Sequence, residues 1–321
     1  CFVLVLSCRV SCLSLVRILN LLVVLFSELV RSTGRTRSYS AAPSYGSKTC
    51  LINTVKPPEL QSGVEVNQPA VLFDESHCEQ CACGAGLDFS FSFAFQPIVD
   101  VINKSVYAYE ALVRGTEGEG AMSVLSKVNE HNRYAFDQVC RVKAVKLAAR
   151  LGMDTMLSIN FMPNAVYRAE YCIRTTLAAA KTYDFDTRKI IFELTEDEAL
   201  NSTSVDHLVS IIEAYQEMGF STAIDDFGAG FSRYNIMMAS PPNLLKLDMA
   251  LVRNIHDEPN KQAVVAGIIT MMKQLGGEII AEGVETKEEY FWLRSQGINL
   301  YQGYLFAKPG FECLPEPDFP A

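Results

Sequence analysis

Residues 223–232 read AIDDFGAGFS, which places two aspartates side by side between an apolar run and a glycine-containing turn. The residues before Asp225 are typical of a buried strand, whereas Asp and Gly both favour turns. Two interpretations fit this stretch alone. It is either an ordinary turn, or the end of a strand whose paired carboxylates bind a cation. The remainder of the chain decides between them.

The strand that ends near Asp225 is one of eight short apolar runs, which are FSFAFQPIV (91–99), VYAYEALV (106–113), MLSINF (156–161), KIIFEL (189–194), STAID (221–225), LLKLD (244–248), EIIAE (278–282) and LYQGY (300–304). Helical patterns lie between most of these runs, at 134–151, 169–183, 205–219, 261–277 and 287–297. This alternation predicts a buried parallel sheet, and eight strands in this length predict an α/β fold, a closed (β/α)8 TIM-like barrel. Only DVINKS joins the first two runs, too short for a helical crossover. We therefore expect a hairpin there and one antiparallel strand.

A polar side chain stands at or near the C-terminal end of strand after strand. These residues are Glu110, Asn160, Glu193, Asp225, Asp226, Lys246, Glu282 and Gln302. A helix cap would explain one such residue, but it does not explain seven strands that each carry one. The C-terminal ends of barrel strands converge on a single mouth, where active sites are built. We therefore expect Asp225 and Asp226 to project into a shared acidic mouth.

The expected mouth offers only oxygen ligands to a metal ion, because none of the four histidines falls in these motifs. Carboxylates and amides favour Mg²⁺ or Mn²⁺ over zinc, which attracts His or Cys. Five crowded carboxylates need about two divalent cations to offset their repulsion. Two cations about 3.5–4 Å apart are machinery for phosphodiester hydrolysis. Lys246 would orient the attacking water or neutralise the developing charge.

The motifs that contain these polar residues resemble those of a known family. The segment YEALVRG (109–115) resembles the signature of the EAL-domain family of cyclic-di-GMP-specific phosphodiesterases. The similarity continues through INFMPN, FELTE, DDFGAGFS, KLD, AEGVE and QGYLFAKP in the family's order, and it covers Phe91 to Pro309. The resemblance implies hydrolysis of the second messenger cyclic di-GMP to linear 5′-pGpG with two Mg²⁺ or Mn²⁺ ions per site.

The resemblance also implies roles for individual residues. The implied metal ligands are Glu110, Asn160, Glu193, Asp225, Asp226 and Glu282, and the implied catalytic residues are Glu282, Lys246 and Asp226. The residues implied to bind substrate are Arg114, Leu112 and Gln302. Asp248 is expected to play a structural part near the mouth, such as a cap.

The loop after Phe227 departs from the family pattern. Glu196 and Ser232 are implied to anchor this loop, which in the family links metal binding to dimerisation, so a homodimer through the barrel is expected. The loop reads GAGFS where the family commonly has GTGYS. The missing hydroxyls bear on the tuning of the loop more than on catalysis.

Three functions therefore compete. The first is an active phosphodiesterase, the second is an inactive cyclic-di-GMP receptor, and the third is a barrel used only for protein interaction. Degenerate family members typically lose metal ligands, and this chain retains every one, which favours the enzyme.

Charge and cysteine content bound the partners and the compartment. Residues 1–58 hold seven of the 28 basic residues and one of the 37 acidic residues, so they carry about +6 and the remainder about −15 of the net charge of −9. An acidic domain is a poor binder of DNA or RNA polymers, although metal ions allow it to bind a small phosphate ligand. The ten cysteines form no evident disulfide framework. A reducing cytoplasm is the expected location, and the family resemblance implies a bacterial one.

Residues 1–86 are expected to form an extension rather than a folded domain, before a barrel at 87–314 and a tail at 315–321. Residues 1–30 are apolar, but their longest uncharged run has ten residues (18–27), against about 20 for a spanning helix. They fit either a signal-peptide core or a poor membrane anchor, and any membrane contact is confined to them. Residues 40–69 are expected to be a disordered linker. The segment HCEQCACG (77–84) is either a metal or redox site or a reduced surface cluster.

Overall fold

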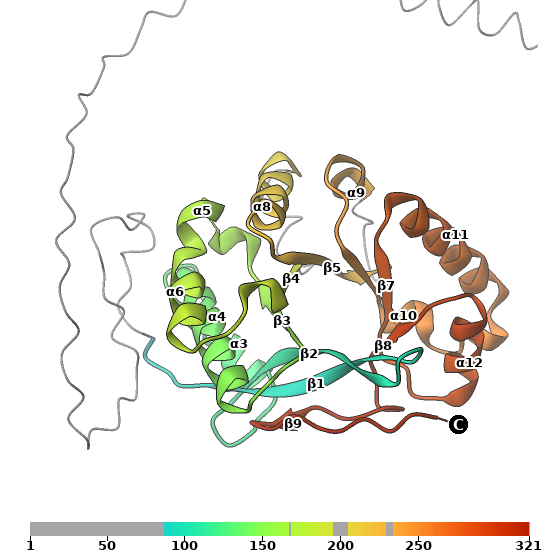
Figure 1. Ribbon diagram of the computed structural model, residues 1–321, viewed down its shortest axis with the longest axis horizontal. Helices are drawn as coiled ribbons and strands as arrows, with labels where there is room; N and C mark the ends of the chain where they lie inside the picture. The colour runs from blue at the N-terminus through green and yellow to red at the C-terminus, as the bar shows by residue number, and fades with distance from the viewer. Residues whose placement is uncertain (1–86, 167, 195–204, 229–233, 321) are drawn as a thin grey trace, which may run out of the picture. The chain divides into compact units, whose positions relative to one another are not determined.

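The computed structural model describes residues 87–166, 168–194, 205–228 and 234–320 (Figure 1). The predictions for the N-terminal extension and its cysteine cluster therefore lie outside the described residues. The same holds for Glu196 and Ser232 of the expected loop anchor. Among the described residues, none of the helices combines the length and apolar character needed to cross a membrane.

Eight strands close into a barrel. They are β1 (Ser92–Asp100), β2 (Ser105–Arg114), β3 (Met156–Phe161), β4 (Ile190–Leu194), β5 (Ser221–Phe227), β6 (Leu244–Leu247), β7 (Glu278–Ala281) and β8 (Leu300–Tyr301). The strands pair in the order β2 to β8 and then β1, and a further pairing between β1 and β2 completes the ring. Strands β2 to β8 run parallel, and β1 runs antiparallel to both of its barrel neighbours. The predicted (β/α)8 barrel with one antiparallel strand is confirmed.

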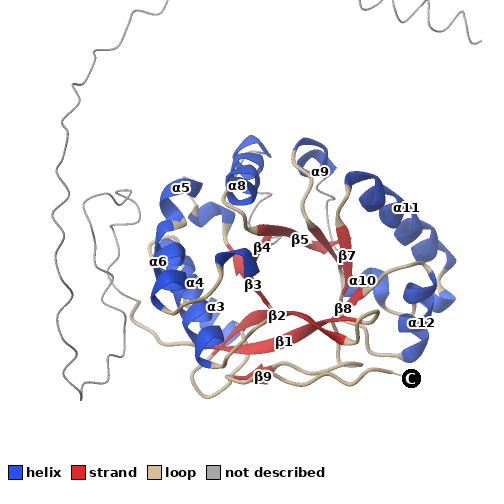
Figure 2. Cartoon of the chain, in the orientation of Figure 1, coloured by secondary structure: helices blue, strands red, loops and turns tan. Residues whose placement is uncertain are grey.

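Helices surround most of the barrel (Figure 2). They are α3 (Met122–Leu125), α4 (Arg133–Arg150), α5 (Ala169–Cys172), α6 (Arg174–Thr182), α8 (Val205–Glu217), α9 (Tyr234–Ala239), α10 (Met249–Val252), α11 (Pro259–Leu275) and α12 (Lys287–Ser295), with 3₁₀ turns at Pro163–Ala165, Thr187–Lys189 and Ile255–Asp257. The single helix predicted over 169–183 is divided at Ile173 into α5 and α6. Ile173 still accepts a hydrogen bond from the amide of Leu177, so the division is slight.

The wall formed by β1 and β2 faces the C-terminal residues (Figure 2). A short strand that the sequence did not predict, β9 (Gly310–Phe311), pairs antiparallel with β1. The hydroxyl of Tyr109 donates to the carbonyl of Pro315, and the amide of Asp318 donates to the carbonyl of Phe306. The segment beyond Leu314 therefore lies against the barrel and covers part of this wall.

The floor of the barrel explains where the polar residues point. One apolar cluster consists of Ile98, Ala108, Ile191, Ala223, Leu244, Ile280 and Leu300. Side chains of a strand alternate between its two faces, so residues two apart share a face. Each of β2, β4, β5, β6, β7 and β8 contributes one residue to this apolar cluster. In every case, the residue two positions later in the chain is one of the predicted site residues. The apolar cluster thus fills the barrel below, and the polar groups line the mouth above it.

Candidate metal and active site

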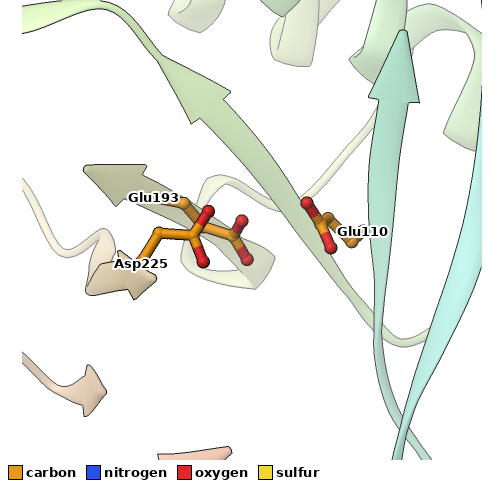
Figure 3. A group of neighbouring side chains, drawn as sticks. All are labelled: Glu110, Glu193 and Asp225. Atoms are coloured by element: carbon orange, nitrogen blue, oxygen red, sulfur yellow. The ribbon is translucent and has the colours of Figure 1, made fainter. Parts of the chain in front are cut away.

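The mouth brings together the predicted polar residues from seven strands. Glu110 lies on β2, Asn160 on β3, Glu193 on β4, Asp225 and Asp226 on β5, Lys246 on β6, and Glu282 and Gln302 directly after β7 and β8. Figure 3 shows the carboxylates of Glu110, Glu193 and Asp225, from β2, β4 and β5, turned into one space. Parallel register sets this arrangement, because Asn160 is paired with Glu193 across β3 and β4.

The ammonium of Lys246 sits at the centre of four carboxylates. Its Nζ lies 2.7 Å from Glu282 Oε1, 2.8 Å from Glu193 Oε2 and 2.9 Å from Asp225 Oδ1. It is also 3.5 Å from Glu110 Oε2. Burial by itself would lower the pKa of Lys246, but the surrounding carboxylates outweigh it and hold that pKa well above its ordinary value. The side chain is therefore a charged cation in the floor of the mouth.

Glu110 is held by two amide groups as well as by Lys246. The Nδ2 of Asn160 donates to its Oε1 at 2.8 Å, and the Nε2 of Gln302 donates to its Oε2 at 2.7 Å. Burial alone would raise the pKa of Glu110, but Lys246 and then these two donors bring it below its ordinary value. Glu110 is therefore an ionised carboxylate with a fixed orientation.

The pKa values of two other carboxyl groups move in the opposite direction. Burial, and then the charge of Glu110, raise the pKa of Glu193 well above its ordinary value, although Lys246 opposes this. Burial raises the pKa of Glu282 in the same way. The hydroxyl of Ser158 donates to Glu193 Oε1 and fixes that side chain. One ammonium is thus too little positive charge for this group of carboxylates, and further positive charge would favour their ionised forms.

The carboxylates form two groups of three that share one member. Glu110, Glu193 and Asp225 make the first group, and Asp225, Asp226 and Glu282 make the second, with the ligand atoms of each group within 4.8 Å of one another. Oxygen-only ligands of this kind suit hard divalent cations. Asp225 is placed to contact an ion in either group.

Two buried amide oxygens add to the fit with a cation. The Oδ1 of Asn160 and the Oε1 of Gln302 have no hydrogen-bond partner among the described residues. Buried polar atoms normally find a partner, so an unpaired acceptor beside a carboxylate cluster calls for a positively charged one. Both amides use their nitrogen to hold Glu110, which leaves their oxygens free to bind. The residues present therefore fit a divalent metal ion.

A break in the register of β5 explains how two adjacent aspartates serve one site. Neighbouring residues of a regular strand point to opposite faces. The pairing of β5 with β6 shifts between Ile224 and Phe227, and Asp226 adopts a left-handed backbone with φ of 53°. Asp tolerates this conformation better than most residues. With this distortion, both carboxylates lie together with that of Glu282 at the mouth.

The carboxyl group of Asp226 has a raised pKa. Partial burial, followed by the adjacent charge of Asp225, raises the pKa of Asp226 to about 6. Its amide donates to Asp225 Oδ1 at 3.0 Å, which orients the carboxylate that the two groups share.

Other predicted residues lie at the rim or serve the fold. Leu112 and Arg114 follow Glu110 on β2 at alternate positions and are half-buried. Arg114 donates to the carbonyl of Val113, its own neighbour. Asp248 caps α10 by accepting a hydrogen bond from the amide of Ala250, as the expected structural role requires.

Sequence reasoning missed two residues of the mouth. The Nε2 of Gln302 is 3.4 Å from the Oε1 of Gln96 on β1, and Gln96 in turn donates to the carbonyl of Ala307. Gln96 is the one amide in an apolar run, and this was the available signal. Ser158 was detectable because it shares a strand face with Asn160.

Comparison with known proteins identifies the class of protein that this barrel and this mouth define. A model of the EAL domain matches residues 87–309, and the chain therefore belongs to the EAL domain family.

Two curated relatives illustrate the range of the family. The chain is 31% identical over 250 residues to the blue light- and temperature-regulated antirepressor BluF of Escherichia coli K12, covering 78% of this chain and 62% of BluF. It is 30% identical over 174 residues to the cyclic di-GMP phosphodiesterase RocR of Pseudomonas aeruginosa, covering 53% of this chain and 42% of RocR. The chain thus spans less than two thirds of either relative.

Two solved structures share the fold. One is a standalone EAL protein from Vibrio cholerae O395 in its c-di-GMP-bound form, with 51% identity and a TM-score of 0.70 over 73% of this chain and 98% of that protein. The other is Klebsiella pneumoniae BlrP1 in complex with manganese and cyclic di-GMP at pH 6, with 33% identity and a TM-score of 0.66 over 71% of this chain and 57% of that one.

Proposed function

We propose that this protein hydrolyses cyclic di-GMP to linear 5′-pGpG at the mouth of the barrel and thereby lowers the cellular level of this messenger. The observation that carries the proposal is the complete set of oxygen ligands, arranged as two groups that share Asp225. Relatives named as cyclic di-GMP phosphodiesterases support the reaction, and the Vibrio structure with bound c-di-GMP supports the substrate.

The proposed cofactors are two Mg²⁺ or Mn²⁺ ions per site. Glu110, Asn160, Glu193 and Asp225 would hold the first ion, and Asp225, Asp226 and Glu282 would hold the second. Such a pair supplies a water nucleophile at neutral pH and offsets charge on the reacting phosphate. The BlrP1 complexes that contain manganese or calcium together with cyclic di-GMP support a divalent cation in this family.

Several residues of the chain would prepare this site through hydrogen bonds and charge. Asn160 and Gln302 orient Glu110, and Ser158 orients Glu193. Lys246 keeps its proton and adds positive charge where negative charge develops. In the net reaction, water adds across one phosphodiester, the bond from phosphorus to the 3′ oxygen breaks, and the phosphate stays on the 5′ oxygen.

Other groups would act on the substrate at the edge of the mouth. Leu112 and Arg114 share a strand face with Glu110 but lie further along β2, so Arg114 would contact a substrate phosphate at the rim. Gln302 would support the opposite side of the bound substrate. Glu196 and Ser232 would anchor the loop after Phe227, and the protein would act as a homodimer in the bacterial cytoplasm. These assignments rest on the family resemblance.

The main alternative is a barrel that binds but does not hydrolyse. BluF is named as an antirepressor, so membership of the family does not by itself decide between turnover and regulation. The ligand set favours turnover here, because Glu110, Glu193 and Asp225 are all present and close together. A receptor or a docking barrel has no need of all of these carboxylates.

The test is turnover of cyclic di-GMP by the full chain with Mg²⁺ or Mn²⁺, measured beside Glu110→Gln and Asp186→Asn. The first variant removes a proposed metal ligand without changing the size of the side chain. We expect its turnover to fall at least about 100-fold, because mutating even a group that supports a metal ligand costs up to about that much. The second removes a partly exposed carboxylate that pairs with Arg188 away from the mouth, and we expect full activity. Binding of cyclic di-GMP without turnover by the parent protein would favour the receptor, and failure to bind would favour the docking barrel.

A further inference from the structure

Helix α4 carries a buried charged pair on the outer face of the barrel, between the strands and the surrounding helices. Arg141 is 0% exposed, and its Nη2 lies 2.7 Å from Oδ2 of Asp137, one helical turn earlier. Its Nη1 donates to the hydroxyl of Tyr215 on α8 at 2.7 Å. The guanidinium therefore joins α4, which packs on β3, to α8, which packs on β5.

The same guanidinium lies among three aromatic rings. Its central carbon is 5.2 Å from the ring centroid of Phe192, 5.6 Å from that of Phe161 and 5.8 Å from that of Tyr215. The rings of Phe192 and Tyr215 also contact each other, with centroids 4.7 Å apart. Cations attract aromatic faces most strongly where water is excluded, as it is here.

Two of these rings are the chain neighbours of two proposed metal ligands. Phe161 follows Asn160 on β3, and Phe192 precedes Glu193 on β4. Alternation along a strand places each ligand toward the mouth and each ring toward the helices. Arg141 therefore contacts the reverse side of two adjacent strands at the level of the ligands.

Asp137 fixes the same place through the backbone. Its Oδ1 accepts a hydrogen bond of 3.0 Å from the amide of Met162, two residues after Asn160. Burial raises the pKa of Asp137, while Arg141 and this amide act against it. The pair thus ties the end of β3 to α4 by a hydrogen bond and by ring contacts.

A core needs no buried ion pair for stability alone. Removing charges from water is costly, and apolar replacements of similar volume are often neutral or stabilising. Groups that orient metal ligands from behind are, by contrast, sensitive to substitution. Building on the metal site proposed above, we propose that Arg141 is a positioning residue, which holds Asn160 and Glu193 in binding geometry through Phe161 and Phe192.

The test is Mn²⁺ binding by the full chain, measured from the loss of the free-ion signal in electron paramagnetic resonance. Arg141→Ala would leave Asp137 as an unpaired buried charge, so the double variant D137N/R141M is used instead. It removes both charges together, and the side-chain carbonyl of the introduced asparagine can still accept the amide of Met162. We expect Mn²⁺ affinity to fall about 10- to 100-fold, as for other groups that support a metal ligand.

The control is Ile268→Ala, which opens a cavity in the core beneath α11, a helix that packs on β7. It should lower the melting temperature at least as far as the double variant and leave Mn²⁺ affinity unchanged. Parental affinity in D137N/R141M, or an equal loss in Ile268→Ala, would overturn the inference. No Mn²⁺ binding by the parent would overturn it together with the metal site. Parental Mn²⁺ binding without turnover would defeat the proposed function only, and the comparison of affinities would still decide the inference.

Discussion

Replacing Lys246 with methionine should make the stability of the fold depend on divalent cations. Lys246 is 1% exposed, and four carboxylates lie within 3.5 Å of its Nζ. Removing one partner of a buried charge pair costs about 3–5 kcal/mol, because the remaining charge stays buried without compensation. A change of 1 kcal/mol moves the melting temperature of a domain of this size by about 2–4 °C. We therefore expect Lys246→Met to melt roughly 6–20 °C below the parent when metal is chelated.

Added metal should reverse most of this loss. A divalent ion supplies the positive charge that the ammonium provided, so the variant should gain more from Mn²⁺ than the parent does. A ligand at about 100 times its dissociation constant stabilises by about 2.7 kcal/mol, which sets the scale of the parental gain. The assay is thermal unfolding of the parent and Lys246→Met, each in EDTA and in saturating Mn²⁺.

The matched control is Lys181→Met, which removes an exposed ammonium from α6. It should melt close to the parent under both conditions, because an exposed charge contributes little. Equal melting temperatures of Lys246→Met and the parent in EDTA would contradict this prediction. It also fails if Mn²⁺ raises the melting temperatures of the parent and Lys246→Met equally.

Three further predictions concern the stability of the fold. Gly228→Ala should cost at least about 1 kcal/mol in urea unfolding, because φ is 110° and a Cβ would lie 2.3 Å from a methyl carbon of Leu251. Glu289→Gln should cost about 1–3 kcal/mol at pH 7. Burial by itself would raise the pKa of Glu289, but backbone amides that donate to its carboxylate bring that pKa below its ordinary value. Its stabilisation is therefore present above the unfolded pKa and is lost as pH falls through the folded one, so the difference in unfolding free energy should shrink as the pH falls below about 4. A difference that stays constant with pH would contradict this. Tyr109→Phe should lower the free energy of unfolding by about 0.5–1.5 kcal/mol and speed proteolysis beyond Pro315, because it removes the hydrogen bond between them. Unchanged proteolysis would show that this hydrogen bond does not hold the C-terminal segment.

The sequence by itself determined the barrel and most of the polar residues of its mouth. Apolar runs alternating with amphipathic stretches were enough to predict strands and helices, and the short DVINKS connection was enough to predict one antiparallel strand. The period of two along each strand placed Glu193 above Ile191 and Lys246 above Leu244. These properties are local, because a strand's face is fixed by the residues of that strand alone.

The tertiary structure decided which of these residues meet and how. The register break that turns Asp226 toward Asp225, and the position of Lys246 among four carboxylates, depend on how neighbouring strands align. Gln96 joined the mouth only because β1 closes the ring. The contacts of Arg141 beyond Asp137 had no recognisable signal, since those partners lie on β3, β4 and α8. Periodicity assigns a side chain to a face, but contacts between distant segments are set by the packing of the whole barrel.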